Sequence, residues 1–188
     1  MNFLAHLFLS GNNEGHLIGN FIADEVKGKS YLNFPEPIIQ GILMHRKIDT
    51  FTDHHPIVKE AKGVVQKEYG KFSGIVIDIY FDHLLAVNWE RYSNETLRSY
   101  TYKIYELLQA HKDMMPLDSQ RFCHYMLEYD IFYNYSKAAG VERVFEGLAG
   151  RAAFKSGMES AGALLQEKFS VFDGYFNAFF PLLNIQRA

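Results

Sequence analysis

Acidic, amide and imidazole side chains recur at steps of four residues in three segments of the first half of the chain. These residues are Asn20 and Asp24, then His45, Asp49 and Asp53, then Asp78 and Asp82 with the adjacent His83. Because residues four apart project from one face of a helix, each segment would present a short polar stripe. Carboxylate oxygens and imidazole nitrogens are ligands for divalent metal ions. The spacing therefore indicates either a metal site or a cluster of paired charges.

The third stripe is the most informative because its surroundings are apolar. Asp78 and Asp82 lie in the segment 75–85, which reads Ile-Val-Ile-Asp-Ile-Tyr-Phe-Asp-His-Leu-Leu. Burying an unpaired carboxylate is costly, and two carboxylates on one helix face also repel each other. A cation must compensate, and in helical bundles a metal ion held by carboxylates and imidazoles of facing helices does so. Asp and His ligands without cysteine suit Mn²⁺, Mg²⁺ or Fe²⁺, and also Zn²⁺.

Each feature taken alone has a simpler interpretation. Two Asp residues four apart most often form a solvated face or half of a salt-bridge network, and His45 with Asp49 is most often a surface pair. His6, within the apolar segment 1–9, is by itself most often a core histidine with its hydrogen bonds satisfied. The combination of three such stripes on an apolar background is what favours a metal site or a charge cluster.

Composition excludes several other chemistries. Lys and Arg number 19 against 22 Asp and Glu, a formal charge of −3, so the chain lacks the basic excess of a general nucleic-acid binder. The single cysteine, Cys123, excludes an intramolecular disulfide and a thiolate zinc cluster. No apolar run approaches the about 18 residues of a membrane span, and the segment 1–9 is typical of a helix rather than a signal peptide. We expect a soluble, cytoplasmic protein.

Apolar residues follow helical spacing over nearly the whole chain, and no strand alternation is sustained. Prolines and glycines mark where the helices begin and end. The predicted helices are residues 2–9, a helix capped by Asn12 or Asn13 and ended by Gly28, then 35–53, 57–69, 74–92, 95–112 and 118–129, shorter helices ending at Gly140 and near Gly150, and a last helix 158–183 with a possible bend near Gly174. This pattern predicts a single all-α domain over 1–188, a compact bundle of about eight to ten helices.

Three tyrosines form a separate stripe in the second half of the chain. Tyr125, Tyr129 and Tyr133 recur every four residues. An aromatic stripe at helical spacing usually belongs to the core. The alternative is the wall of an amphipathic channel for a long, flexible ligand.

Several motifs together resemble the acyl carrier protein phosphodiesterase family. They are Met-Asn-Phe-Leu-Ala-His-Leu at 1–7, Gly-Asn-Phe-Ile-Ala-Asp at 19–24 followed by Lys27-Gly28, and Met-His-Arg-Lys-Ile-Asp at 44–49 followed by Thr52-Asp53. The segment 78–83, the downstream Trp89 and the C-terminal Phe180-Pro181 are also similar. The resemblance runs in order over nearly the whole chain and is weaker in the second half.

The resemblance implies an all-α fold like that of the HD metal-dependent phosphohydrolases, with Asp82-His83 standing in reversed order to the usual His-Asp pair. It implies hydrolysis of the phosphodiester that links 4′-phosphopantetheine to a serine of holo-acyl carrier protein, with Mn²⁺ as the usual metal and Mg²⁺ or Fe²⁺ as alternatives. On this basis we expect the metal ligands to be Asp24, His45, Asp49 and Asp82. Residues in reserve, as ligands or as supports of ligands, are His6, Asn20 and Asp53.

Three further residues are expected to act on the substrate. Arg46 would hold a phosphoryl oxygen by a charge-assisted hydrogen bond, and His83 would handle the proton of the leaving serine. Asp78 is the third catalytic candidate and also a reserve ligand.

The expected partner constrains the charge distribution. Acyl carrier proteins are acidic, and this chain is also net negative. Attraction must therefore come from a local basic group, for which we expect Lys27, Lys29, Arg46 and Lys47.

Two other functions are compatible with the same residues. One is an HD-type hydrolase of a nucleotide or another small phosphoester, which product analysis would separate from a carrier-protein phosphodiesterase. The other is a non-enzymatic helical binding protein whose acid–imidazole cluster is only structural, which predicts no turnover and no bound transition metal.

Overall fold

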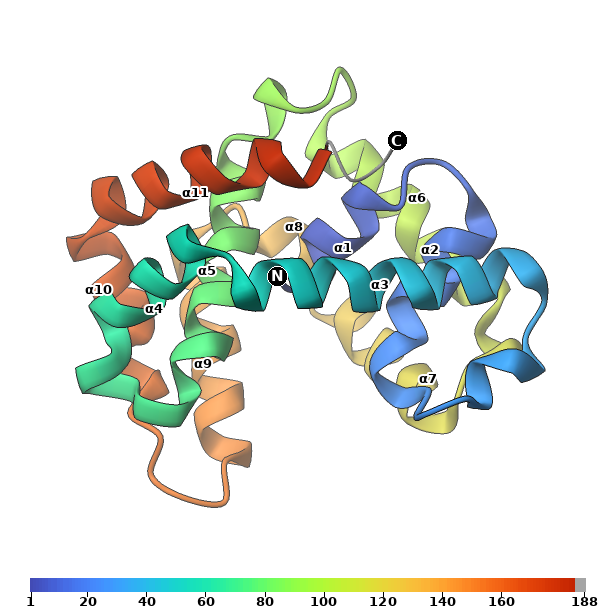
Figure 1. Ribbon diagram of the computed structural model, residues 1–188, viewed down its shortest axis with the longest axis horizontal. Coiled ribbons are helices and arrows are strands. Elements are labelled where there is room, and N and C mark those ends of the chain that lie inside the picture. The colour runs from blue at the N-terminus through green and yellow to red at the C-terminus, as the bar shows by residue number, and fades with distance from the viewer. Residues whose placement is uncertain (185–188) are drawn as a thin grey trace.

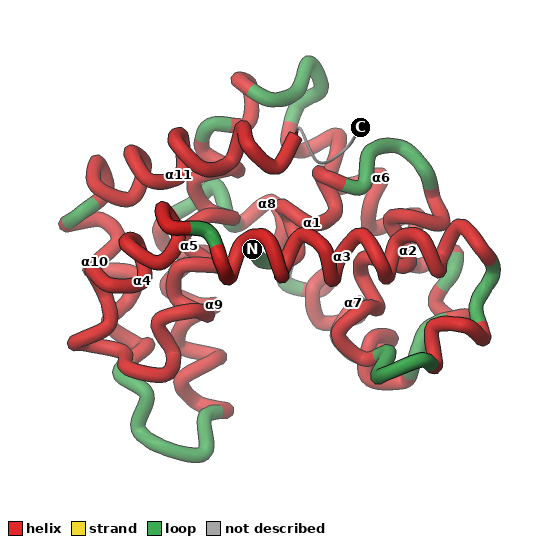
Figure 2. Tube along the Cα trace, in the orientation of Figure 1, coloured by secondary structure: helices red, strands yellow, loops and turns green. Residues whose placement is uncertain are grey.

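The computed structural model describes residues 1–184, and this part of the chain is helical without any strand (Figures 1 and 2). Ten of its α-helices are longer than one turn and α8 is a single turn, which confirms the all-α prediction. The helices are α1 Phe3–Leu9, α2 Glu14–Ile22, α3 Glu36–His54, α4 Pro56–Tyr69, α5 Ser73–Val87, α6 Leu97–Ala110, α7 Leu117–Glu128, α8 Ile131–Asn134, α9 Ala138–Arg151, α10 Ala161–Glu167 and α11 Phe169–Asn184.

Short 3₁₀ segments join several of these helices. They are η1 Ala23–Glu25, η2 Ser30–Asn33, η3 Gly70–Phe72, η4 Trp89–Arg91, η5 Lys112–Met114 and η6 Met158–Ser160. Helix α2 begins at the cap Asn13, whose side chain accepts a hydrogen bond from the backbone of His16. Gly28 and Gly70 adopt positive φ angles of 55° and 50° where the chain turns after η1 and α4.

Helix α5 is central, as its apolar sequence predicts. Its residues Tyr80, Phe81 and Leu84 are fully buried, and it packs against α1, α4 and α11. Phe81 contacts Phe176 and Phe179 of α11, with ring centroids 5.7 and 5.9 Å apart. Because α5 is buried on most sides, any carboxylate on it must find a partner from a neighbouring element.

Helices α2 and α3 pack unusually closely, and this contact positions part of the candidate site. A Cβ at Gly19 would lie 2.1 Å from the carbonyl oxygen of Ile38, and one at Gly41 would lie 2.4 Å from that of His16. Only glycine fits at these two points. The close approach sets Asn20 of α2 against His45 of α3.

Several helix boundaries differ from the prediction. Helix α2 ends at Ile22, before Gly28, and α5 ends at Val87, before residue 92. Gly140 lies inside α9 rather than at a helix end, because the absence of a side chain lets the backbone pass Asn134, whose carbonyl oxygen would be 2.1 Å from a Cβ. Gly174 does not bend the last helix. The interruption falls instead near Lys168, between α10 and α11. No helix among the described residues combines the length and apolar character needed to cross a bilayer.

Candidate metal centre

A cavity of about 320 Å³ is lined by residues of helices from both the first and the second half of the chain. One wall is polar and comes from α1, η1 and α3, and the opposite wall is apolar and comes from α7, α8 and α9. Helix α5 contributes Asp78 between these walls, and exposed Arg151 stands at the open edge on α9. The polar wall holds His6, Asp24, His45, Asp49 and Asp53. Asp24 of the first predicted stripe and the whole of the second stripe therefore line one cavity, whereas Asn20 is buried behind it.

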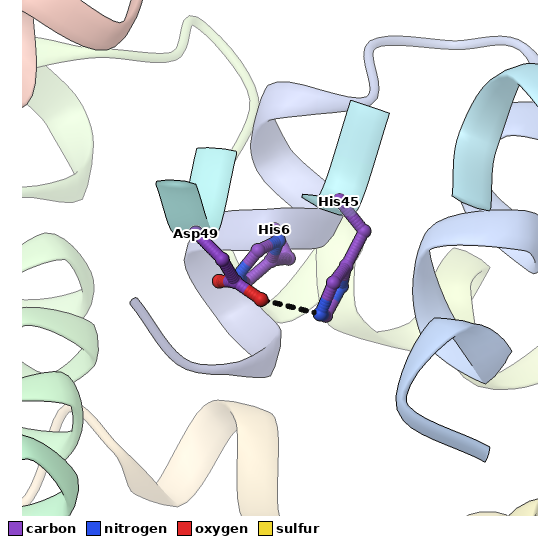
Figure 3. Close-up of side chains that lie close together, drawn as sticks. All are labelled: His6, His45 and Asp49. Carbon is purple, nitrogen blue, oxygen red and sulfur yellow. Dashed lines mark hydrogen bonds and ion pairs between the residues drawn. The ribbon is translucent and has the colours of Figure 1, made fainter. Parts of the chain in front are cut away.

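Two histidines converge on one carboxylate in the polar wall (Figure 3). Nε2 of His6 lies 3.0 Å from Oδ1 of Asp49, and Nε2 of His45 lies 3.0 Å from Oδ2 of the same side chain. The imidazole rings are stacked, with their centroids 4.0 Å apart. One ligand atom from each of the three residues lies within 4.8 Å of the others. Two imidazole nitrogens and a carboxylate so placed form a donor set that can hold a divalent ion.

Asp24 adds a second carboxylate to this group. Its Oδ1 lies 3.3 Å from Nε2 of His45, and its side chain is 64% exposed. It comes from η1, which follows α2 directly. Asp24 therefore reaches the group formed by His6, His45 and Asp49 from the solvent side of the cavity.

Asn20 supports both histidines. Its Oδ1 lies 2.9 Å from Nδ1 of His45, and its Nδ2 donates to the backbone carbonyl of His6 at 3.0 Å and to the hydroxyl of Ser10 at 2.8 Å. Nδ1 of His45 also faces the backbone carbonyl of Asn20 at 3.0 Å. A ring nitrogen that faces two oxygens carries the proton, which leaves Nε2 directed at the carboxylates. Asn20 thus orients the imidazole of His45, as a support behind a metal ligand does.

The charges of the group follow from burial and hydrogen bonding. Burial opposes a charge on His45, but its hydrogen bonds to Asp24 and Asp49 raise its pKa to about 9. Burial lowers the pKa of His6 to about 4, and its hydrogen bond to Asp49 offsets only part of that effect. Burial alone would raise the pKa of Asp49, but hydrogen bonds from both histidines hold it well below its usual range. Without a metal ion, one proton on His45 partly neutralises the two carboxylates.

Asp82, expected as a ligand, lies away from this group. Its two oxygens accept hydrogen bonds from the backbone N–H groups of Leu4 and Ala5, at 2.8 and 3.1 Å. These are free N–H groups in the first turn of α1, and Asn2 at the cap position makes no such bond with its side chain. Burial raises the pKa of Asp82 to about 7, against the effect of the two backbone bonds. The buried carboxylate is compensated by a helix N-terminus instead of a metal ion, and it fixes the helix that carries His6.

Asp78 and Asp53 do line the cavity, and each has a cationic partner. The α-amino group of Met1 donates to Oδ1 of Asp78 at 2.9 Å, and Nζ of Lys62 donates to Oδ1 of Asp53 at 2.8 Å. Neither belongs to the group formed by His6, His45 and Asp49.

His83 and Arg46, expected to act on the substrate, are not brought to the cavity wall. Nδ1 of buried His83 lies 2.6 Å from the backbone carbonyl of Tyr135. The guanidinium of Arg46 donates to the carbonyls of Val26 and Gly28, at 2.7 and 3.1 Å. Arg46 thus holds the loop after η1, and through it the position of Asp24.

The expected basic group divides over two surfaces. Lys27 and Lys29 are exposed in the loop next to Asp24, and Nζ of Lys27 donates to the backbone carbonyl of Asp24. Lys47 lies on another face of α3, where it lines a second, smaller pocket with Phe51 and Leu183. Arg151, which the sequence did not single out, adds a cation at the open edge of the cavity.

The apolar wall is the part of the cavity that the sequence patterns identified least. Its members from α7, α8 and α9 are Phe122, Tyr125, Met126, Ile131, Val144 and Leu148. The available signals were the tyrosine stripe, of which Tyr125 lines the cavity, and the i, i+4, i+7 spacing of Val144, Leu148 and Arg151 on one face of α9.

Comparison with known proteins gives a consistent family assignment. A family model described as "Acyl carrier protein phosphodiesterase" matches residues 1–183. A protein of that name from Yersinia pestis is 29% identical over 184 residues, which cover 97% of this chain and 95% of the relative. One from Photorhabdus laumondii is 28% identical over 97% of this chain and 93% of its own length. One from Enterobacter sp. (strain 638) is 30% identical over 99% of this chain and 97% of its own.

No solved structure matches the chain significantly. The sequence relationship is nonetheless nearly full-length in both directions, and the matched residues include every side chain of the polar wall. The chain therefore belongs to the acyl carrier protein phosphodiesterase family of enzymes.

Proposed function

We propose that this protein is a metal-dependent phosphodiesterase that releases 4′-phosphopantetheine from holo-acyl carrier protein and leaves the apo-carrier. The observation that carries the proposal is the convergence of His6, His45 and Asp49 at one wall of the cavity, in a chain whose named relatives are acyl carrier protein phosphodiesterases. The alternative substrate is a nucleotide or another small phosphoester, and the experiment below distinguishes the two.

The donor set fits a divalent ion. Nε2 of His6, Nε2 of His45 and the carboxylate of Asp49 would hold it, with Asp24 as a further carboxylate. Oxygen and imidazole donors without thiolate suit Mn²⁺, Mg²⁺ or Fe²⁺, and we propose Mn²⁺. When bound, such an ion offsets the negative charge of the phosphodiester, makes a water more acidic and stabilises the leaving oxygen.

The chain's own residues then have separate tasks in the hydrolysis. A water oxygen bonds to phosphorus, the bond from phosphorus to the serine oxygen breaks, and the serine oxygen takes up a proton. We assign the proton to Asp78, which lines the cavity beside the polar wall: it accepts the proton of the attacking water and returns one to the serine oxygen. Asn20 holds His45 in place, and Asp82 holds the helix that bears His6.

Exposed cations near the cavity would attract an acidic carrier protein to it. Lys27 and Lys29 stand beside Asp24, and Arg151 stands at the open edge of the cavity on α9. Their local positive charge offsets the net charge of −3 of the whole chain.

Incubation of the protein with holo-acyl carrier protein and Mn²⁺, followed by mass spectrometry, tests the proposal. We expect the carrier to lose the mass of its phosphopantetheine arm and free 4′-phosphopantetheine to accumulate. His45→Ala should lower both bound metal and turnover, the latter by more than about 100-fold, whereas Leu127→Ala, which changes a half-buried residue outside the cavity, should keep both. An intact carrier together with turnover of a nucleotide panel would instead identify a small-phosphoester hydrolase.

A further inference from the structure

We propose that the apolar wall of the cavity binds the pantetheine arm of the substrate and thereby determines which phosphodiesters are hydrolysed. Of the wall's six residues, Met126 is buried and the other five are half-buried, namely Phe122, Tyr125, Ile131, Val144 and Leu148. This inference rests on the proposed function, because it concerns the same cavity and the same substrate.

The apolar wall is partly exposed to the cavity. The five half-buried side chains of the wall come from three different helices. Phe122, Ile131, Val144 and Leu148 pack on the core with one side and leave the other to the cavity, which Tyr125 also lines. Apolar side chains that converge on a concave surface and stay partly exposed are characteristic of a ligand site.

Size restricts what can lie against this wall. The cavity of about 320 Å³ is at the small end of ligand pockets. It can take a slender chain, whereas a folded carrier protein must stay outside. If the scissile phosphate lies at His6, His45 and Asp49, the groups bonded to it on the arm side must occupy the remaining cavity, which is the apolar wall.

The chemistry of the wall matches that of the arm. Pantetheine begins, next to the phosphate, with two methyl groups on one carbon, and continues with two amides separated by short alkyl segments. The aliphatic side chains of Ile131, Val144 and Leu148 suit the alkyl parts. For the amides, the cavity offers the hydroxyl of Tyr135, which accepts a hydrogen bond from Nδ2 of Asn2 at 2.9 Å and can itself donate.

Tyr125 joins the two sides of the apolar wall. A Cβ at Gly147 of α9 would lie 3.8 Å from the hydroxyl oxygen of Tyr125, so the tyrosine of α7 reaches across to α9. Its ring also contacts that of Tyr129, with centroids 4.8 Å apart. Of the tyrosine stripe, Tyr125 lines the cavity, whereas Tyr129 is exposed and Tyr133 packs against the core.

This placement fixes the direction of the substrate. The arm lies inside, and the serine oxygen, which is the leaving group, lies toward the opening with its protein attached. The exposed Lys27, Lys29 and Arg151 then face the carrier protein rather than the arm.

A double variant with a matched control tests the assignment. Val144→Ala combined with Leu148→Ala removes apolar contacts from the wall, and Val64→Ala combined with Leu127→Ala removes the same groups from half-buried sites elsewhere. For holo-acyl carrier protein, we expect the wall variant to raise KM about tenfold or more and the control to leave it unchanged. Turnover of bis(p-nitrophenyl) phosphate, which has no arm, should be the same in wild type and control, and in the wall variant it should fall by a smaller factor than turnover of holo-acyl carrier protein.

Direct binding provides a readout that does not depend on folding of the variants. Pantetheine, which lacks the phosphate, should bind the wild-type protein in calorimetry and inhibit it competitively against holo-acyl carrier protein. No binding of pantetheine, or an unchanged KM in a folded wall variant, would overturn the inference while the proposed function stands. Failure of the wild type to release the arm at all would overturn the proposed function itself.

Discussion

Asn20 joins the two histidines of the candidate metal centre by hydrogen bonds to the backbone of His6 and to the ring of His45. It is 1% exposed, so water cannot replace these bonds. The site thus depends on a few buried polar atoms whose hydrogen-bond partners lie on different helices. Removing one partner leaves the other unsatisfied and also frees the ring that it orients.

Asn20→Ala should therefore weaken both the fold and the metal centre. We expect the free energy of unfolding to fall by about 1–3 kcal/mol, because buried polar groups of His6 and His45 lose their partner. Affinity for Mn²⁺ should fall by about 10–100-fold. Urea unfolding and calorimetric titration measure the two effects, and Asn12→Ala, at an exposed position, is the control. Unchanged metal affinity in a folded Asn20→Ala protein would contradict the role of this residue.

Metal binding should depend on pH through His45. In the metal-free protein its pKa is about 9, so an ion at Nε2 must displace a proton at neutral pH. Apparent affinity for Mn²⁺ should then rise about tenfold per pH unit below pH 9 and level off above it. The stability of the metal-free protein changes with pH in the opposite direction to metal affinity. The proton on His45 stabilises the folded state fully below the unfolded pKa of 6.5, and this contribution is lost as the pH rises through about 9.

Anaerobic calorimetry in buffers of different ionisation enthalpy measures this exchange. Close to one proton should be released per ion bound at pH 7.5. His6 adds nothing to that release, because its pKa of about 4 leaves it neutral there. Affinity that stays constant between pH 6.5 and 8.5 would show that His45 is not the displaced group.

Helix α1 illustrates how one element positions another. The helix has seven residues, too few to be stable alone, and its side-chain cap is missing. Asp82 of α5 supplies the cap from 78 residues away, and Asp78, four residues earlier on the same helix, holds the α-amino group of Met1. Helix α5 therefore fixes both the start and the direction of the helix that carries His6.

Asp82→Asn should change how stability depends on pH. The folded pKa of about 7 lies above the usual 3.8, so the folded state binds the extra proton between these values, and the Asp82 contribution to stability falls as pH rises through that window. The free energy of unfolding of wild type relative to Asp82→Asn should drop by at most about 1.4 kcal/mol per pH unit there. Urea unfolding at pH 4.5, 5.5, 6.5 and 7.5 measures this difference, and parallel curves for the two proteins would refute the shift.

Over the whole molecule, a net charge of −3 and an acidic cavity wall would repel the acidic carrier protein that we propose as substrate, so attraction must come from exposed cations near the cavity. Lys27 and Lys29 lie together beside Asp24, whereas Lys47 faces a different pocket. In Figure 1 the region after α2 and helix α4 lie toward opposite ends of the molecule. The effect of removing a positive charge near the cavity, at Lys27 or Lys29, can therefore be compared with the effect of removing one from α4.

Lys27→Glu combined with Lys29→Glu should raise KM for holo-acyl carrier protein about tenfold at low salt, with kcat little changed. The difference from wild type should shrink toward 0.5 M salt, because exposed charges are screened. Lys67→Glu, at an exposed position of α4, is the control. A wild-type KM that does not depend on salt would argue against an encounter led by charge.

By itself, the sequence determined the helical class, most helix boundaries and the family, since apolar spacing, prolines, glycines and contiguous motifs are local properties of the chain. It also placed His45 and Asp49 on one face, because a step of four residues has that consequence in any helix. The tertiary structure decided which groups these polar side chains contact. The periodicity of α5 is the same whether Asp82 meets a metal ion or the N-terminus of α1, and only the packing of α1 on α5 settles which. Likewise, the apolar wall joins side chains of α7, α8 and α9 to a polar wall about 100 residues away along the chain, a proximity that only folding creates.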